Sequence, residues 1–208
     1  MNYEIMTFKQ SSPEWFKVKQ RTISGTLSYD LLKHGKTYAL QQAFKHATNS
    51  LRYSGPVSKA AKRGLDLEPD ARYLLREKLI QQGIYDETLK IDEVGFVLRT
   101  DIENVGCSPD GVIFDEDRIK EICEIKCFGF KHHESCHEKI DEHIMCQIQW
   151  NVWITEAECC YFVQYNPDYL DERLTEDGRR HPDKVLYIKK ILPNEKYQKA
   201  FKKALNES

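Results

Sequence analysis

Residues 106–127 read GCSPDGVIFDEDRIKEICEIKC, and the predicted fold is built outward from this stretch. It contains two short apolar runs, at 112–114 and 122–127, and each has the composition of a β-strand. The acidic triplet at 115–117 separates them. Two such runs joined by a short polar loop predict a β-hairpin with its turn near Asp115.

The hairpin gathers charged side chains on one side of the predicted strands. Because successive strand residues point to opposite faces, Glu124 and Lys126 share a face. The turn brings Asp110 beside them. Two carboxylates on one side offer the hard oxygen ligands that Mg²⁺ prefers. A neighbouring lysine can steer a metal-bound water or balance the developing charge of a phosphate.

The alternative is a surface hairpin whose charges are solvated. The second apolar run argues against it, since Cys123, Ile125 and Cys127 fill one face. On the other face, Ile122 precedes Glu124. The run therefore predicts a buried strand, in which a charge is costly unless it is paired or bound to a metal. We favour a metal site.

Length and cysteine usage limit the class of protein. The 208 residues suit one domain with a sizeable core. No apolar run approaches the length of a membrane span, and the first residues do not have the pattern of a signal peptide. Seven cysteines without disulfide-like spacing predict a reduced, cytoplasmic protein.

The charge distribution is more informative than the net charge of −2. Residues 1–65 hold 11 Lys and Arg against 3 Asp and Glu, residues 66–183 hold 13 against 28, and residues 184–208 hold 7 against 2. An acidic middle between basic ends predicts a metal-binding centre flanked by surfaces for a polyanion. A soluble surface of mixed charge remains the alternative.

Helical patterns dominate the chain before the hairpin. Ser12-Pro13 is typical of an N-cap followed by proline at the first helical position. Helices are predicted at 14–20, 27–34, 37–52 (with Leu40, Phe44 and Ala47 at helical spacing) and 58–83, with a loop at 54–56. Pro69 should kink the last helix or begin a new one. Glu68 beside it is interpreted from the pattern alone as a helix-cap acid.

Basic and hydroxyl side chains surround the first helix. Lys19 and Arg21 lie at its end, and Ser24-Gly25-Thr26 follows. Lysines and small hydroxyls around a helix start favour a phosphate pocket. A capped helix-turn-helix edge is the other interpretation.

Strands and helices alternate in the rest of the chain. Residues 92–100 alternate as a strand, and 138–155 have helical periodicity that leaves room for Gln147 to point back at the metal centre. Two further strands at 159–165 and 185–192 enclose a polar loop at 168–183, and Pro193 opens a final helix. The pattern predicts an α/β fold with five strands.

A second cluster of metal-ligand types follows the hairpin. It consists of Cys127, His132, His133, Cys136 and His137. Zinc accepts two cysteines and two histidines, but this spacing fits no usual finger pattern. The cysteines also lack the spacing of an iron–sulfur site. We interpret the stretch as a loop with ordinary histidines.

Four sequence blocks together resemble a known family. Cys107-Ser108-Pro109-Asp110-Gly111 followed by Glu124-Ile125-Lys126 resembles the PD-(D/E)xK nuclease core. The other blocks are the Trp15–Thr26 segment, GLDLEPDAR at 64–72 and QIQWNVWIT at 147–155. In this order the chain is similar to the phage lambda exonuclease (YqaJ-like viral recombinase) family.

The resemblance implies a restriction-endonuclease-like core, with a central mixed five-stranded sheet flanked by helices. It also implies one exonuclease domain over residues 1–208. Within it, 1–65 would be a basic helical part that binds DNA ends, 66–166 the catalytic core, and 167–208 a C-terminal strand and helix.

The resemblance also assigns roles to individual residues. Asp110, Glu124 and Glu68 would bind metal with the carbonyl of Ile125, which replaces the cap interpretation of Glu68. Lys126 would position or help deprotonate the attacking water. The remaining expected site residues are Gln147 at the edge of the active site, Lys19 or Arg21 with Thr26 and Ser108 on the 5′ phosphate, and Lys36 in the DNA groove. The family usually has arginine at position 19, so the choice between Lys19 and Arg21 stays open.

The implied activity is processive 5′→3′ degradation of double-stranded DNA, releasing mononucleotides and leaving 3′ single strands for recombination. The resemblance implies two Mg²⁺ ions (with Mn²⁺ able to substitute), a homotrimeric ring, and a phage single-strand annealing protein as partner, in the cytoplasm of a bacterial host. A PD-(D/E)xK endonuclease and a non-catalytic DNA-binding module are the alternatives.

Overall fold

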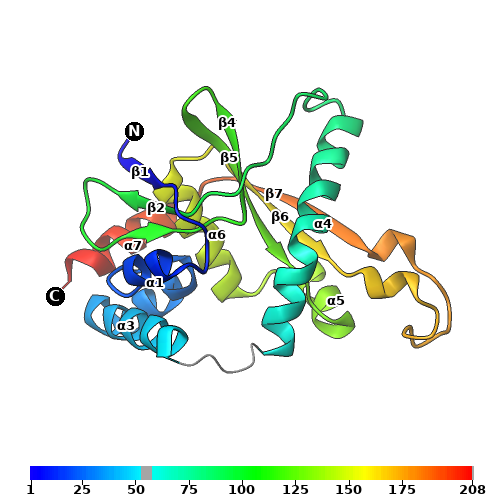
Figure 1. The fold of residues 1–208 in the computed structure, drawn as a ribbon, viewed down its shortest axis with the longest axis horizontal. Helices are drawn as coiled ribbons and strands as arrows, with labels where there is room; N and C mark the ends of the chain where they lie inside the picture. The colour runs from blue at the N-terminus through cyan, green and yellow to red at the C-terminus, as the bar shows by residue number, and fades with distance from the viewer. Residues whose placement is uncertain (53–57, 208) are drawn as a thin grey trace.

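The computed structural model describes residues 1–52 and 58–207, so the loop predicted at 54–56 lies outside the described residues. Within these ranges the strands form two sheets (Figure 1). One is a four-stranded sheet in the order β4-β5-β6-β7, and the other is a three-stranded sheet in the order β1-β2-β3. Helices pack around both.

The four-stranded sheet contains the predicted hairpin. Strands β4 (Gly111–Asp115) and β5 (Arg118–Lys126) pair antiparallel. β5 also pairs in parallel with β6 (Cys159–Tyr165), and β7 (Leu186–Ile191) closes the sheet antiparallel to β6. The sheet is therefore mixed, as predicted, and β5 lies inside it with a neighbour on each side.

The predicted single five-stranded sheet is wrong. Strand β2 (Phe96–Arg99) pairs with β1 (Tyr3–Met6) and β3 (Gly106–Cys107). The start of the predicted 92–100 strand lies outside β2, and there Asp92 forms an isolated bridge with Val112 of the hairpin. Apolar alternation indicates which faces of a strand are buried. It does not indicate which neighbour satisfies the backbone hydrogen bonds, so the separate sheet could not be foreseen.

The N-terminal helices follow the predicted order. Helix α1 (Pro13–Lys19) is capped by Ser12, whose hydroxyl accepts from the amide of Trp15 at 3.2 Å. Helices α2 (Ser28–His34) and α3 (Lys36–Arg52) follow the short turn η1 (Gly25–Leu27). Phe44, which lies at helical spacing in α3, points outward.

Alanines form the buried face of α3. Ala39, Ala43 and Ala47 are buried at a spacing of four residues, whereas Phe44 is 60% exposed. Small side chains let the helix approach its neighbours closely. The larger Phe44 lies one position off this face and projects outward.

Helix α4 (Lys59–Gln81) is continuous through Pro69, so no new helix begins there. A proline removes one hydrogen bond to the carbonyl four residues earlier, which here belongs to Leu65. Leu65 is 59% exposed, so this part of the helix lies at the surface. The helix packs across β5 and β6 and carries Glu68 to the end of the hairpin.

The remaining helices join and cover the sheets. The crossover from β5 to β6 contains α5 (Phe130–Glu138) and α6 (Glu142–Thr155), so the helix predicted at 138–155 begins four residues later than expected and ends where predicted. The cysteine- and histidine-rich stretch is helical rather than the predicted loop. The remaining short elements and the last helix are η2 (Pro167–Leu170), η3 (Pro182–Lys184) and α7 (Glu195–Asn206).

Strand β5 is buried on both faces. Ile122 belongs to the larger hydrophobic core, and Cys123 and Ile125 belong to the smaller one beneath α4. Glu124 is fully buried on the same face as Ile122. Among the described helices, none is both long and apolar enough to cross a membrane.

Candidate active site

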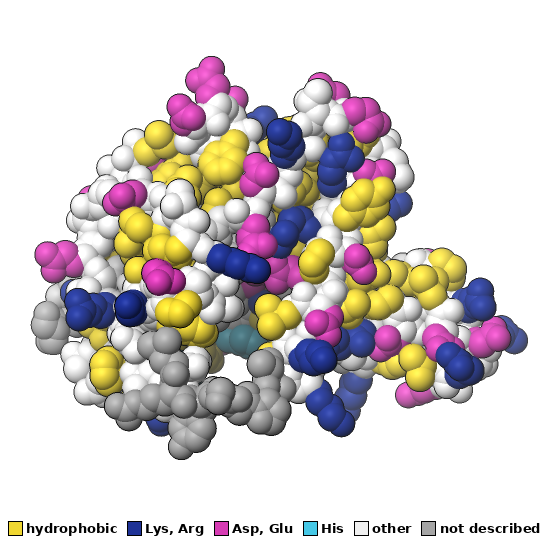
Figure 2. All heavy atoms as spheres, in the orientation of Figure 1, with side chains coloured by type: hydrophobic (Ala, Val, Ile, Leu, Met, Phe, Trp, Pro, Cys, Tyr) yellow, Lys and Arg dark blue, Asp and Glu magenta, His cyan; other side chains and the backbone are white. Residues whose placement is uncertain are grey.

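A cleft of about 670 Å³ opens where the hairpin ends, between α1, η1, α4, β5 and α6. Figure 2 shows acidic and basic side chains side by side in the middle of this face. The cleft contains most of the predicted site residues: Lys19, Thr26, Glu68, Ser108, Asp110, Glu124, Ile125, Lys126 and Gln147. The fold therefore brings together side chains that are up to 128 positions apart in the sequence, because α1, α4, β5 and α6 converge here.

Glu124 is the most enclosed charge in the cleft. Its Oε1 atom accepts from the ammonium of Lys126 and from Nε2 of Gln147, the latter at 2.6 Å. Its Oε2 atom accepts from Nδ2 of Asn151 at 3.0 Å. Two helical amides and a lysine thus orient one carboxylate whose exposed fraction is 0%.

Asp110 is fixed against the neighbouring strand. Its Oδ2 atom accepts from the amide of Ile125 at 2.7 Å, and its own amide donates to the carbonyl of Cys123 at 3.2 Å. These bonds extend the hairpin by one more step and hold Asp110 beside Glu124, as predicted.

Arg72 connects Glu68 to the hairpin. Its Nη2 atom lies 2.5 Å from Oε1 of Glu68, and its Nε atom donates to the carbonyl of Asp110 at 2.9 Å. Arg72 is one helical turn beyond Glu68, so both point at the same place. Arg72 belongs to the GLDLEPDAR motif at 64–72, but its bonds to Glu68 and to the Asp110 carbonyl were not predicted.

The three carboxylates disturb one another's ionisation. Burial and the nearby charge of Asp110 raise the pKa of Glu124 to about 7, and the same two causes raise the pKa of Glu68 to about 7. Burial raises the pKa of Asp110 as well. Burial lowers the pKa of Lys126, but Glu124 and Asp110 raise it more, so its net pKa is above the ordinary value.

The donor set suits a hard cation. Three carboxylates and the Ile125 carbonyl are oxygen ligands of the kind that Mg²⁺ takes, and their mutual repulsion is what a cation would offset. As the side chains stand in residues 1–52 and 58–207, no three or more His, Cys, Asp or Glu are arranged to hold an ion. Glu68 and Glu124 are bonded to Arg72 and Lys126, whose positive charges offset part of the repulsion in this arrangement.

Lys19 and Ser108 line the cleft on the α1 side. The ammonium of Lys19 lies 4.2 Å from the ring centroid of Trp15, and burial lowers its pKa to about 8. The hydroxyl of Ser108 donates to the carbonyl of Gly95 at 2.8 Å and accepts from Nε1 of Trp15 at 3.2 Å. Trp15 thereby joins the two predicted phosphate-binding residues.

Of the other residues predicted to contact DNA, one lines the cleft and two do not. Thr26 lines the cleft, and its hydroxyl lies 3.2 Å from that of Ser24. Arg21 is exposed, Lys36 begins α3, and neither belongs to the lining of the cleft. The roles of all four predicted phosphate residues and of Lys36 stay predictions.

Asn151 was not predicted from the sequence. A signal was present, because Asn151 follows Gln147 by four residues, and residues so spaced on a helix share a face. The role of Asn151 depends on the packing of α6 against β5, where both amides donate to Glu124.

The histidine and cysteine cluster is dispersed by its helix. His132 lies 2.8 Å from Asp141, His133 bonds the carbonyl of Lys184 at 2.8 Å, and His137 stacks on Tyr187. The histidines point to different partners, and no metal-binding group occurs among the described residues. These contacts favour a structural role.

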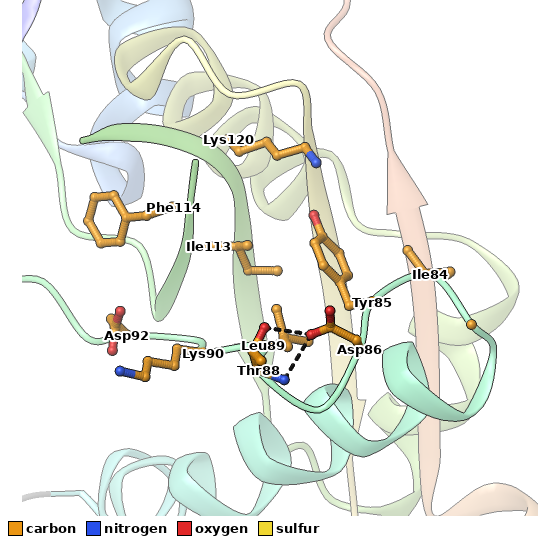
Figure 3. A pocket seen from close by; sticks show the side chains of 11 residues that line it. Ile84, Tyr85, Asp86, Thr88, Leu89, Lys90, Asp92, Ile113, Phe114 and Lys120 are labelled. Carbon is orange, nitrogen blue, oxygen red and sulfur yellow. Dashed lines mark hydrogen bonds between the residues drawn. The ribbon is translucent and has the colours of Figure 1, made fainter. Parts of the chain in front are cut away.

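A second open pocket of similar size lies beside the hairpin, in the bend between α4 and β4 (Figure 3). Tyr85, Asp86, Lys90, Asp92 and Lys120 provide its polar groups. Asp86 accepts from the amide and hydroxyl of Thr88 at 2.8 and 2.5 Å, the two bonds drawn in Figure 3. Carboxylates do not converge here as they do in the cleft.

Known structures share the fold. An alkaline exonuclease (LHK-Exo) from Laribacter hongkongensis is 23% identical, with a TM-score of 0.65, over 94% of this chain and 92% of that chain. The same enzyme in complex with dAMP is 22% identical, with a TM-score of 0.67, over 93% and 89%. A phage related exonuclease from Haemophilus somnus 129PT is 16% identical, with a TM-score of 0.56, over 88% and 90%.

Sequence comparison places the chain in a family. No curated protein matches it. The family model described as the YqaJ-like viral recombinase domain matches residues 14–158, a range that includes Glu68, Asp110, Glu124, Lys126 and Gln147. Because that range is well over half of the 208 residues, this protein belongs to the YqaJ-like viral recombinase domain family.

Proposed function

We propose that this protein is a Mg²⁺-dependent 5′→3′ exonuclease that acts on double-stranded DNA. The observation that carries the proposal is the convergence of Asp110, Glu124, Glu68 and Lys126 in one cleft of a chain from this family. The exonuclease structures that share its fold support it, and one of them holds dAMP, a mononucleotide of the kind such an enzyme releases.

Hydrolysis of a phosphodiester needs an activated water and a stabilised leaving oxygen. Bound Mg²⁺, or Mn²⁺ in its place, supplies both by lowering the pKa of water and by neutralising developing charge, and a pair of ions can serve the two ends of an in-line displacement. In this proposal Asp110, Glu124, Glu68 and the carbonyl of Ile125 bind the ions.

Lys126 has two tasks in the proposed reaction. While bonded to Glu124 it holds a positive charge at the reacting end of the hairpin. If Glu124 held a cation, the Lys126 ammonium would be available at the cleft to orient the attacking water or to stabilise the phosphate in the transition state. Gln147 keeps Glu124 in place throughout.

The end of the DNA is held on the α1 side of the cleft. Lys19, Thr26 and Ser108 line that side, and they would grip the terminal 5′ phosphate. The excess of 11 basic over 3 acidic residues in 1–65 supplies contacts to phosphates that do not depend on sequence. DNA binding should therefore weaken steeply as salt rises.

The family resemblance extends the proposal to the assembly. We propose a homotrimeric ring that threads the duplex, which would make digestion processive. The 3′ single strand that remains would pass to a phage single-strand annealing protein.

The decisive test is digestion of a linear duplex labelled at either end of one strand, with and without Mg²⁺, beside a closed circular duplex. The proposal expects Mg²⁺-dependent release of mononucleotides from the 5′ end, with the circle intact. Nicking of the circle would make the protein an endonuclease. If neither substrate were hydrolysed, the protein would be interpreted as a non-catalytic DNA-binding module.

A matched pair of lysine variants tests the chemistry. Lys126→Ala should retain the fold and DNA binding but lose cleavage by about 10²- to 10⁴-fold, the range for a group that moves or orients a proton. Lys120→Ala removes the same charge from the same strand, at the pocket in Figure 3, and should cleave normally. Full activity of Lys126→Ala would exclude the catalytic role proposed for Lys126.

A further inference from the structure

We propose that Asn151 is a positioning residue that fixes the second carboxylate oxygen of Glu124, and that Gly25 exists to let the neighbouring turn pack against it. The inference rests on the proposed function, in which Glu124 binds metal. It adds to that function a physical link between the metal centre and the turn that carries Thr26.

The two oxygens of Glu124 are held differently. Oε1 has two donors, Lys126 and Gln147, so losing one leaves the other. Oε2 accepts from Nδ2 of Asn151 at 3.0 Å, and the described part of the chain gives it no other hydrogen bond. Loss of Asn151 would therefore leave Oε2 without a donor from the described part of the chain, while Oε1 keeps both of its own.

Helix α6 holds Asn151 rigidly. Its side chain is buried, with an exposed fraction of 1%. The hydroxyl of Thr155, one turn later, donates to the carbonyl of Asn151 at 2.7 Å. The amide orientation is set by chemistry, because an ionised carboxylate only accepts hydrogen bonds and must face the NH₂ group. Oδ1 is consequently left buried without a partner.

Gly25 lies directly against that amide. A Cβ atom built at Gly25 would be 2.4 Å from Oδ1 of Asn151 and 3.1 Å from Cγ of Gln147. The first distance is shorter than real Cβ contacts, so any other residue at position 25 must displace the amide. Glycine is required here by close approach.

The contact connects two parts of the cleft. Gly25 opens η1, and Thr26 beside it lines the cleft on the side proposed to hold the 5′ phosphate. The same turn rests on the amide that orients Glu124. A disturbance at η1 would therefore reach the metal ligand mainly through Asn151, whose Oδ1 is the atom nearest to Gly25.

Metal affinity measures this role without substrate. The partner that orients a ligating carboxylate is typically worth about 10- to 100-fold in metal affinity. In calorimetric titrations of the full chain with Mn²⁺ alone, Asn151→Ala should raise the Kd by that factor. Asn151→Leu, which fills the space but donates nothing, should do the same.

Gln149→Ala is the matched control on the same helix. Gln149 is also a buried amide with two hydrogen bonds, from Nε2 to the carbonyl of Leu192 at 2.9 Å and from the amide of Asn194 to Oε1 at 2.8 Å. These bonds tie α6 to the start of α7, away from Glu124. Gln149→Ala should lower the melting temperature yet leave the Mn²⁺ Kd within about twofold. If Asn151 were only structural, Asn151→Ala would give this same result.

Gly25→Ala tests the link itself. It should weaken Mn²⁺ binding in the otherwise unchanged protein although it touches no carboxylate. In the Asn151→Ala background it should add less than about twofold, because the nearest atom to the new methyl group is gone and the milder 3.1 Å approach to Cγ of Gln147 is what remains. Additive effects would show that Gly25 acts by another route and would overturn the link.

The outcomes separate this inference from the function on which it rests. Mn²⁺ binding and cleavage by the unchanged protein, together with an unchanged Kd in both Asn151 variants, would overturn the inference and leave the proposed function standing. An unchanged protein that binds no Mn²⁺ would overturn the proposed function first. A Kd raised in both Asn151 variants but not in Gln149→Ala would support the assignment.

Discussion

Two buried glutamates on β5, three residues apart and on opposite faces, have opposite surroundings. Glu121 is 4% exposed and accepts from the hydroxyl of Tyr85 at 2.7 Å and from Nζ of Lys190 at 3.1 Å. Burial raises its pKa, but these donors lower it more, so the net pKa is below the ordinary 4.5. Glu124 is fully buried among other carboxylates, and its pKa is raised to about 7.

The comparison distinguishes a buried charge that stabilises the fold, at Glu121, from one suited to catalysis, at Glu124. A buried charge is costly unless it is compensated, and the chain compensates Glu121 with its own donors. Glu124 also has donors, but Asp110 and Glu68 lie beside it and add repulsion, so its pKa stays raised. Such an arrangement is typical of functional sites. Cavity size does not separate the regions, since the pocket beside Tyr85 and the cleft have volumes of about 660 and 670 Å³.

The largest expected effect is that of Glu124→Gln on catalysis. The amide keeps the shape but loses the charge that would hold a cation, and the cation supplies several kcal/mol of transition-state stabilisation. We expect cleavage of linear duplex DNA to fall by about 10³-fold, with a cooperative thermal transition retained. Cleavage at the normal rate would show that Glu124, like Glu121, is only structural.

Lys19→Ala should have a smaller and more selective effect. If the ammonium grips the terminal phosphate, its loss removes one hydrogen bond between charged groups, worth about 1.5–3 kcal/mol. The kcat/KM on 5′-phosphorylated ends should then fall by about 10- to 100-fold, and that on 5′-hydroxyl ends should change little.

Lys17→Ala is the control for this prediction, because Lys17 is an exposed lysine on the same helix outside the cleft. It should leave both substrates unaffected. Equal losses on the two kinds of end for Lys19→Ala would exclude phosphate recognition, and Arg21 would then be the candidate to test.

Glu121→Gln should affect stability and not activity. Replacing the carboxylate weakens hydrogen bonds to a charged acceptor, so we expect a loss of about 1.5–3 kcal/mol in the free energy of unfolding. Because the folded pKa of Glu121 is lowered, its contribution is present above pH 4.5 and is lost as the pH falls through the folded value. Denaturant titrations should show the difference in unfolding free energy from the unchanged protein narrowing as the pH falls below 4.5. A difference independent of pH would contradict this assignment.

The sequence predicted what is local and missed what depends on pairing. The hairpin and its charges at Asp110, Glu124 and Lys126 follow from strand alternation within 22 residues. The separate sheet formed by β1 could not be predicted, because residues 3–6 carry no alternation strong enough to identify their partner. Arg72 and Asn151 were missed for a related reason: a polar side chain on a helix acquires a role only when the facing element is known.

The smallest expected effect concerns Tyr85, which borders the pocket in Figure 3 and donates to Glu121. Tyr85→Phe removes one hydroxyl and should cost about 1 kcal/mol, with normal cleavage. In the Glu121→Gln background the same change should cost measurably less, because the charged acceptor is already gone, and a double-mutant cycle by denaturant titration measures that coupling. Full additivity would mean that the hydroxyl contributes by packing, and that Lys190 and the thiol of Cys159 are the donors that compensate the charge of Glu121.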